Sequence, residues 1–311
     1  MPAGASGSIS FHLMRNMKFH DDRRSFFPIR RIFPFNDAGR YDVIPIGKAV
    51  IIMYAVLSEL LSDKKGDAVF SCFGLWHLCY LLATIAVAVI AILYLKRKGD
   101  KTRQKTMSLF MNLAFVLYIA DFFLMPFAYG KMDVEKLPFH ICTAMCVMCF
   151  WSRHNAFLGK YKQSFALLGF ISNLVYLIYP AGVMWYQVHP LSYRVIQTLL
   201  FHGLMTIYGL LVLIFDDIPF RWKRCCRDLA VIVFMTVWAM LGNALYTGHA
   251  WGQSQNFNWF FVTQDPFYII PENFAPYIMP FLNIAVFFAA DMLVYALYFM
   301  IQKSLPKRAA S

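Results

Sequence analysis

Charged side chains are scarce in this chain of 311 residues. Asp, Glu, Lys and Arg together make up 15% of the sequence, whereas 59% of the residues are hydrophobic and 18% are aromatic. A water-soluble protein cannot easily cover its surface with so few charges. The chain also lacks the GxSxG, HExxH, Walker and GxGxxG motifs. The common sequence signatures of hydrolases, metalloproteases and nucleotide-binding enzymes are therefore missing.

In place of such motifs, the chain contains seven long apolar runs. Most reach the roughly 20 residues that an α-helix needs to cross a hydrocarbon core about 30 Å thick. Runs this long are helical, because only helices or closed barrels satisfy their backbone hydrogen bonds in lipid. We therefore expect an all-α fold, a polytopic membrane protein built as a bundle of seven transmembrane helices. The runs are Phe73–Leu95, Met107–Tyr129, Leu137–Trp151, Ser164–Trp185, Val195–Phe215, Leu229–Gly248 and Tyr277–Ile301.

The net charge of +12 would suggest a nucleic-acid partner in a soluble protein, but the positions of the cations favour a membrane explanation. The segments after the first, third, fifth and seventh runs carry 16 Lys and Arg, whereas those after the second, fourth and sixth carry 3. By the positive-inside rule the cation-rich segments are cytoplasmic. We expect a transmembrane domain over residues 73–302, a cytoplasmic tail at 303–311 and no nucleic-acid partner.

The first 70 residues contain ten further Lys and Arg, and no early apolar segment of the kind found in a cleavable signal peptide. We expect residues 1–43 to form an irregular basic tail and residues 44–72 to form an interfacial or re-entrant amphipathic segment. Within the latter, Ile44–Leu61 is apolar but short, with Lys48 and Glu59 near its ends. It fits a helix lying in the membrane interface, or else an eighth span that would place the basic tail inside.

Cys146 and Cys149 have CxxC spacing but lie inside one apolar run, and the histidines show no HxxxH pattern. A disulfide framework, a metal site and a cofactor are therefore not expected. Cys142, Cys146 and Cys149 lie on one stripe of a helix, and close helix packing is a sufficient explanation for the latter two. Cys225 and Cys226 follow a helix end, where palmitoylation and a plain juxtamembrane pair are both compatible with the sequence.

Polar side chains inside the apolar runs are costly in hydrocarbon, so their placement is informative. With a rise of about 1.5 Å per residue, six of them fall within about 5–12 Å of the predicted outer boundary. For a single residue such as His77, a hydrogen bond between helices is an equally good explanation. Asp291 differs, because it lies deeper and towards the cytoplasmic half. The six residues in the outer layer are His77, Asp121, His140, Cys142, His202 and Asn243.

Cys142 and His202 are the pair in this layer that could perform chemistry. A thiol is a useful nucleophile as the thiolate, and a neighbouring imidazole can take its proton. Asp121 or Asn243 could orient that imidazole as the third member of a triad. His140 is two residues from Cys142 and points about 160° away on an ideal helix, so we expect it to support the site or pack rather than act as the base.

Aromatic residues crowd the segment His249–Pro276, which lacks Lys and Arg. Aromatic rings favour the headgroup level of a membrane. We expect the segment to lie over the bundle as a lid, with an ordinary aromatic belt as the alternative.

Three segments resemble the YwaF-type bacterial integral membrane proteins. FGLWHL at Phe73–Leu78 is similar to the FGxxHL start of their first span, LPFHIC at Leu137–Cys142 to their LPLHLC segment, and FHG at Phe201–Gly203 to their SHG. The likeness covers about residues 65–301, whereas the long basic N-terminal tail and Phe201 depart from the pattern. A short amphipathic stretch precedes FGxxHL in that family, which favours the interfacial position of Ile44–Leu61.

The chain also resembles the transmembrane protein 164 family of phospholipid acyltransferases, whose catalytic cysteine and histidine correspond to Cys142 and His202. That family is akin to androgen-inducible intramembrane hydrolases of fatty acid esters, in which a Thr replaces the Cys. The resemblance implies a thioester-forming enzyme that acts on a membrane phospholipid or lysophospholipid. The alternative is a transporter or ligand-binding membrane protein for a small solute or proton, although the sequence shows no inverted repeat.

Overall fold

The computed structural model describes residues 46–61, 68–129, 134–184, 187–216, 222–246, 258–265 and 269–304. Within these ranges the chain is helical and contains no strand, in agreement with the predicted all-α class. The expected basic tail (1–43) lies outside the described residues, as do residues 305–311 of the expected cytoplasmic tail.

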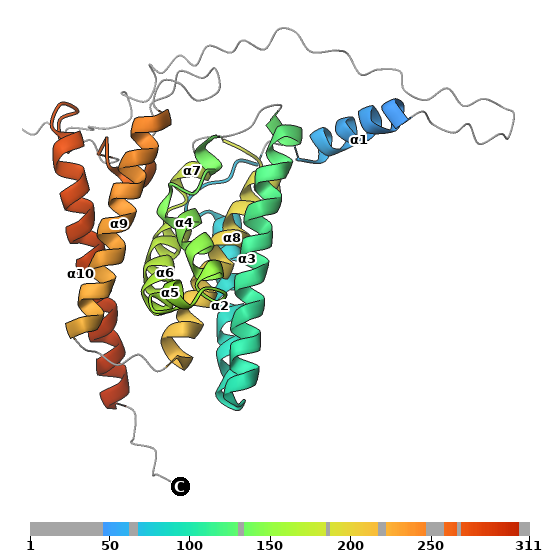
Figure 1. Cartoon of the computed structure of the whole chain (residues 1–311). Helices are drawn as coiled ribbons and strands as arrows, with labels where there is room; N and C mark the ends of the chain where they lie inside the picture. The colour runs from blue at the N-terminus through green and yellow to red at the C-terminus, as the bar shows by residue number, and fades with distance from the viewer. Residues whose placement is uncertain are drawn as a thin grey trace, which may run out of the picture. The chain divides into compact units, whose positions relative to one another are not determined.

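Each of the seven apolar runs coincides with a helix, drawn as coiled ribbons in Figure 1. The helices are α2 (Leu75–Lys96), α3 (Asp100–Tyr129), α4 (Ile141–Trp151), α6 (Lys162–Ile178), α8 (Tyr193–Phe215), α9 (Trp222–Tyr246) and α10 (Ala275–Ser304).

Five of these helices, α2, α3, α8, α9 and α10, are long and apolar enough to cross a membrane. The other two are shorter than their runs, and a proline lies at the shortened end of each. The third run includes Pro138, and α4 begins only after the turn in which the Phe139 N–H donates to the Leu137 carbonyl at 2.7 Å. In the fourth run the helix stops at Ile178, because the residue before Pro180 is disfavoured in the α region. Five spans therefore follow from helix length, and seven remain a prediction.

Shorter elements connect the long helices. They are α1 (Ile46–Leu61), α5 (Ala156–Gly159), α7 (Ala181–Met184), and the 3₁₀ turns η2 (Val134–Lys136) and η3 (Trp259–Phe261). The apolar part of α1, Ile51–Leu61, is too short to qualify as a span. The interfacial position of α1 remains a prediction.

Helix α8 is the most buried of the long helices. In its most apolar stretch 72% of the residues are buried inside the protein, against 17% in α2. Helices α2, α3 and α6 pack against it. The backbones of α8 and α6 approach closely at Gly209, where a Cβ atom would lie 2.6 Å from the Phe170 Cβ and 2.7 Å from the Ala166 carbonyl oxygen. A small residue at this crossing lets the two backbones approach closely.

Helices α9 and α10 pack against each other and against α6 (Figure 1). The outer helices expose large apolar side chains, such as Leu82 and Ile90 on α2 and Phe281 and Leu293 on α10. A soluble monomer rarely exposes so much contiguous apolar surface, whereas lipid covers it without cost. The chain is an integral membrane protein with several spans.

Candidate functional site

Helix α6 contacts both residues of the predicted catalytic pair. The Cys142 thiol interacts with the Ser172 hydroxyl. The His202 ring stacks on the Tyr176 ring, with centroids 3.9 Å apart and planes inclined by 12°. Ser172 and Tyr176 are four residues apart, so they lie on the same face of α6. The thiol and the imidazole therefore reach one helix face, a single turn apart.

The contacts at Gly169 show how helices α4 and α8, which carry Cys142 and His202, are placed along α6. A Cβ atom at Gly169 would lie 3.4 Å from the Cβ of Met145 on α4 and 3.5 Å from the Cε of Met205 on α8. Met145 and Met205 each follow their member of the pair, Cys142 or His202, by three residues. Cys142 and His202 consequently lie at matching levels along α6.

The His202 ring is held in one orientation by its own helix. Its Nδ1 lies 2.7 Å from the Thr198 carbonyl oxygen, and a carbonyl only accepts, so Nδ1–H donates. In the neutral imidazole Nε2 then carries the free lone pair. The ring edge of Phe201 packs nearly perpendicular to it at 5.1 Å, and His202 is buried. The imidazole is thus preset as a proton acceptor at Nε2.

Asp121 is occupied by groups other than the imidazole. Its carboxylate lies 2.9 Å from the Lys136 ammonium and accepts a hydrogen bond from the Tyr193 hydroxyl at 3.0 Å. Lys136 and His140 both interact electrostatically with His202. Asp121 is therefore linked to the site through its ion pair with Lys136. The hydrogen bond to His202 Nδ1 is made by the Thr198 carbonyl.

His140 lies just outside helix α4 as its N-cap residue, with φ −70° and ψ 140°. The expected angle of about 160° from Cys142 assumed an ideal helix through both residues. That assumption is wrong, because the helix starts at Ile141. The supporting role of His140 remains a prediction, now based on its electrostatic contact with His202.

His77 uses both ring nitrogens, and one of its two bonds joins helices α2 and α6. Nδ1 accepts from the Phe73 N–H at 2.9 Å, and Nε2 donates to the Leu177 carbonyl at 2.7 Å. The side chain is fully buried. Because Leu177 directly follows Tyr176, this bond fixes α6 next to the ring that supports His202. These contacts match the helix-to-helix hydrogen bond that was the alternative explanation of His77.

Asn243 holds the aromatic segment. Its Oδ1 accepts from the Trp259 N–H at 3.1 Å, and its Nδ2 donates to the carbonyls of Trp259 at 3.1 Å and Ala239 at 2.9 Å. These bonds fasten the start of η3 to α9. Residues 258–265, one of the two parts of the predicted lid that the structure describes, are therefore anchored by Asn243.

The sequence indicated Cys142 and His202 as candidates but did not indicate several of the groups that surround them. Thr198 acts through a backbone carbonyl, which any residue would supply. Tyr176 and Ser172 are ordinary residues of an apolar helix until its partners are known. Lys136 carried a usable signal, because it is a cation that directly precedes the LPFHIC segment.

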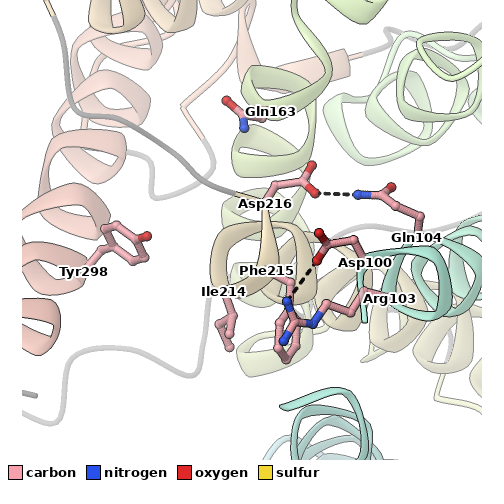
Figure 2. Close-up of a pocket in the computed structure, with 8 residues that line it drawn as sticks. All are labelled: Asp100, Arg103, Gln104, Gln163, Ile214, Phe215, Asp216 and Tyr298. Carbon is pink, nitrogen blue, oxygen red and sulfur yellow. Dashed lines mark hydrogen bonds and ion pairs between the residues drawn. The ribbon is translucent and has the colours of Figure 1, made fainter. Parts of the chain in front are cut away.

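A pocket of about 510 Å³ lies at the opposite end of α6 (Figure 2). In it Gln104 donates to Asp216 at 2.9 Å and Arg103 pairs with Asp100 at 3.1 Å, while Tyr298 of α10 stands across from them. Gln163 is nine residues from Ser172, or about 14 Å along the helix, so the pocket is separate from the Cys142 layer. The lining residues are Asp100, Arg103, Gln104, Gln163, Ile214, Phe215, Asp216 and Tyr298.

A buried ionic cluster adjoins this pocket. Arg224 pairs with Asp228 at 3.3 Å and donates to Tyr295 at 2.9 Å and to Gln163 at 2.6 Å. Asp291 is buried nearby, and its Oδ1 has no hydrogen-bond partner among the described residues. A polar centre therefore exists in the half of the bundle where Asp291 was expected.

A comparison with known proteins finds a family match over most of the chain. The model of the TMEM164 family matches residues 72–301. No curated protein and no solved structure matches the chain. The match covers all the residues of the site and excludes the N-terminal segment with α1.

Proposed function

The chain belongs to the TMEM164 family, and on this basis we propose that it is an intramembrane acyl-transfer enzyme acting on membrane phospholipids. Cys142 is the nucleophile and His202 is the base. The observation that carries the proposal is the contact of both side chains with one face of α6, at Ser172 and Tyr176.

The first half-reaction forms a thioester. His202 Nε2 takes the thiol proton of Cys142, and the sulfur attacks the carbonyl carbon of a lipid ester. The tetrahedral intermediate collapses by breaking the bond to the alcohol oxygen, which receives the proton back from the imidazolium. A lysophospholipid leaves and the acyl group stays on sulfur. All atoms and the proton are accounted for without a cofactor.

The second half-reaction runs the same steps towards an acceptor. His202 takes the proton of a lysolipid hydroxyl or of water, and the oxygen attacks the thioester carbonyl. The thiolate leaves and recovers the proton from the imidazolium. Transferase and hydrolase activity differ only in this acceptor.

The surrounding groups prepare these steps. The Thr198 carbonyl keeps the imidazole in the tautomer that accepts at Nε2. The Lys136 cation interacts electrostatically with His202, and its ion pair with Asp121 partly neutralises that cation. The arrangement proposed for the membrane is seven helices with the C-terminus cytoplasmic and α1 in the interface. Cys142 then lies about 8–10 Å below the outer boundary, close to the ester carbonyls of a phospholipid.

The test uses the full chain in lipid nanodiscs with an isotopically labelled phospholipid donor and a lysophospholipid acceptor. Mass spectrometry measures labelled product and labelled Cys142 peptide. We expect Cys142→Ala to abolish both, and His202→Ala to lower them by about 10²–10⁴-fold, the usual contribution of a general base. Cys146→Ala is the matched control, since Cys146 is buried one turn further along α4. Transfer by Cys142→Ala at the wild-type rate would refute the proposal.

A second candidate function is proton-coupled transport, which the pocket and the buried Asp291 beside it favour. It predicts proton flux in proteoliposomes, measured with a trapped pH-sensitive dye, that Asp291→Asn abolishes and Cys142→Ala leaves intact. Absence of flux in the wild type removes this candidate.

A further inference from the structure

The turn that precedes Cys142, Leu137–His140, is held by helix α9. The Trp238 Nε1–H donates to the Pro138 carbonyl at 2.7 Å. The Phe139 ring stacks on the Trp238 ring at 5.0 Å and also contacts the ring of Trp259 at 4.9 Å. Phe139 is buried. The start of α4 is therefore held in place by the Phe139 ring, which packs among aromatic rings of other elements.

Gly242 provides the seat for this ring. A Cβ atom at Gly242 would lie 2.4 Å from the Phe139 Cδ1 and 2.5 Å from its Cγ, so the ring rests on the backbone of α9. No side chain larger than hydrogen fits without moving Phe139. Because Phe139 is three residues from Cys142, any shift of the ring acts on the first turn of α4.

A second wall of the seat is a strained segment held by two asparagines. Asn243 accepts a hydrogen bond from the Trp259 N–H and donates one to the Trp259 carbonyl. Asn283 of α10 donates to the carbonyls of Phe260 at 2.7 Å and Phe261 at 3.1 Å. Phe260 and Phe261 have φ values of 57° and 51°. Aromatic residues rarely adopt this left-handed region, so the conformation depends on the bonds that hold it.

We propose that Phe139 is a positioning residue for Cys142, and that the Trp259–Phe261 segment sets the place of the thiol through it. The proposal rests on the role of Cys142 in the proposed function. When the segment is in place, Phe139 is held by its contacts with both Gly242 and Trp259, and the first turn of α4 is fixed. When Asn283 no longer holds the segment, Trp259 withdraws and the thiol loses its alignment with His202.

The test compares Gly242→Ala with Gly99→Ala in the full chain in nanodiscs. A Cβ at Gly99 would have nothing within 4 Å, so this control adds the same methyl group in open space. We expect Gly242→Ala to lower kcat for acyl transfer by at least about tenfold with KM nearly unchanged, since a small misplacement of a reacting group costs rate rather than binding. Gly99→Ala should match the wild type.

Two further variants keep the proposal falsifiable if Gly242→Ala folds poorly. Asn283→Ala releases only the segment and should also lower kcat. In a Phe139→Ala background, Gly242→Ala should have no additional effect, because the ring it displaces is absent. Additive losses from the two substitutions, or an unchanged kcat in Asn283→Ala, would overturn the proposal.

A second readout does not depend on catalysis. The rate of alkylation of Cys142, relative to Cys149 on the same helix, is followed by mass spectrometry. Gly242→Ala and Asn283→Ala should change this ratio severalfold. A changed ratio in a protein without transferase activity would mean that the positioning is right and the proposed function wrong. An unchanged ratio would defeat the positioning itself.

Discussion

Thr198 contributes to the candidate site through its carbonyl oxygen, which fixes the His202 tautomer within one turn of the same helix. No residue choice at position 198 reveals this, because every residue has the same carbonyl. The sequence indicates Cys142, His202 and Asp121 as candidates, since ionisable groups are conspicuous in apolar runs. Their partners were not predictable, because Tyr176 is one of 17 tyrosines and nothing local distinguishes it.

At the residue scale, the stacked ring of Tyr176 should support catalysis. Tyr176→Leu removes the flat surface under the imidazole, and we expect transfer to fall about two- to tenfold, the equivalent of the 0.5–1.5 kcal/mol typical of an aromatic pair. Tyr176→Phe keeps the ring and should retain most of the rate. Equal losses in both variants would assign the effect to the hydroxyl instead.

The ion pair of Asp121 and Lys136 gives a stability prediction. The Asp121 side chain is 4% exposed and that of Lys136 is 23% exposed. Asp121→Asn leaves a partly buried cation without its counter-charge, so we expect a loss of about 1–2 kcal/mol in the free energy of unfolding. Equilibrium unfolding in mixed micelles measures it.

Asp100→Asn is the control, because Asp100 is 91% exposed in its pair with Arg103. It should change the free energy of unfolding by less than about 0.5 kcal/mol. Similar losses in the free energy of unfolding for the two substitutions would show that burial does not explain the stabilisation by the Asp121–Lys136 pair.

At the scale of the helices, the apolar runs predicted every long element, and proline chemistry accounts for the two that are shorter. Pro138 falls before α4 and Pro180 after α6, so both helices are shorter than their apolar runs. Hydropathy cannot register this, because proline interrupts a helix through its backbone and not through its polarity. Hydropathy also does not indicate which helix is central, because α2 and α8 are both strongly apolar.

The crossing of α6 and α8 should be intolerant of added volume. Gly209→Ala would place a methyl group against the Phe170 Cβ and the Ala166 carbonyl. We expect a loss of about 1–3 kcal/mol from overpacking, seen as a lower thermal midpoint. Gly99→Ala again serves as the control. A thermal midpoint unchanged by Gly209→Ala would show that the two backbones separate easily.

At the scale of the whole molecule, the distribution of Lys and Arg predicts the orientation in the membrane. Cysteines introduced at Gly99 and Ser254 should be labelled from opposite sides by a membrane-impermeant maleimide, because one segment is rich in cations and the other has none. Ser254 lies outside the described residues. Exposed Cys79 and Cys226 are replaced beforehand. Labelling of both positions from one side would exclude the predicted topology.

Gly169 has a consequence for how this site can be altered. The methionines one turn beyond Cys142 and His202 meet at the same glycine, so residue 169 sets the spacing of the helices that carry the proposed nucleophile and base. A Cβ at Gly169 would sit at ordinary contact distances of 3.4 and 3.5 Å, so alanine fits and a branched side chain does not. Alanine should therefore leave the distance between thiol and imidazole almost unchanged, and valine should widen it. Protein engineers would thereby gain one position at which the separation of the two reacting groups is adjustable.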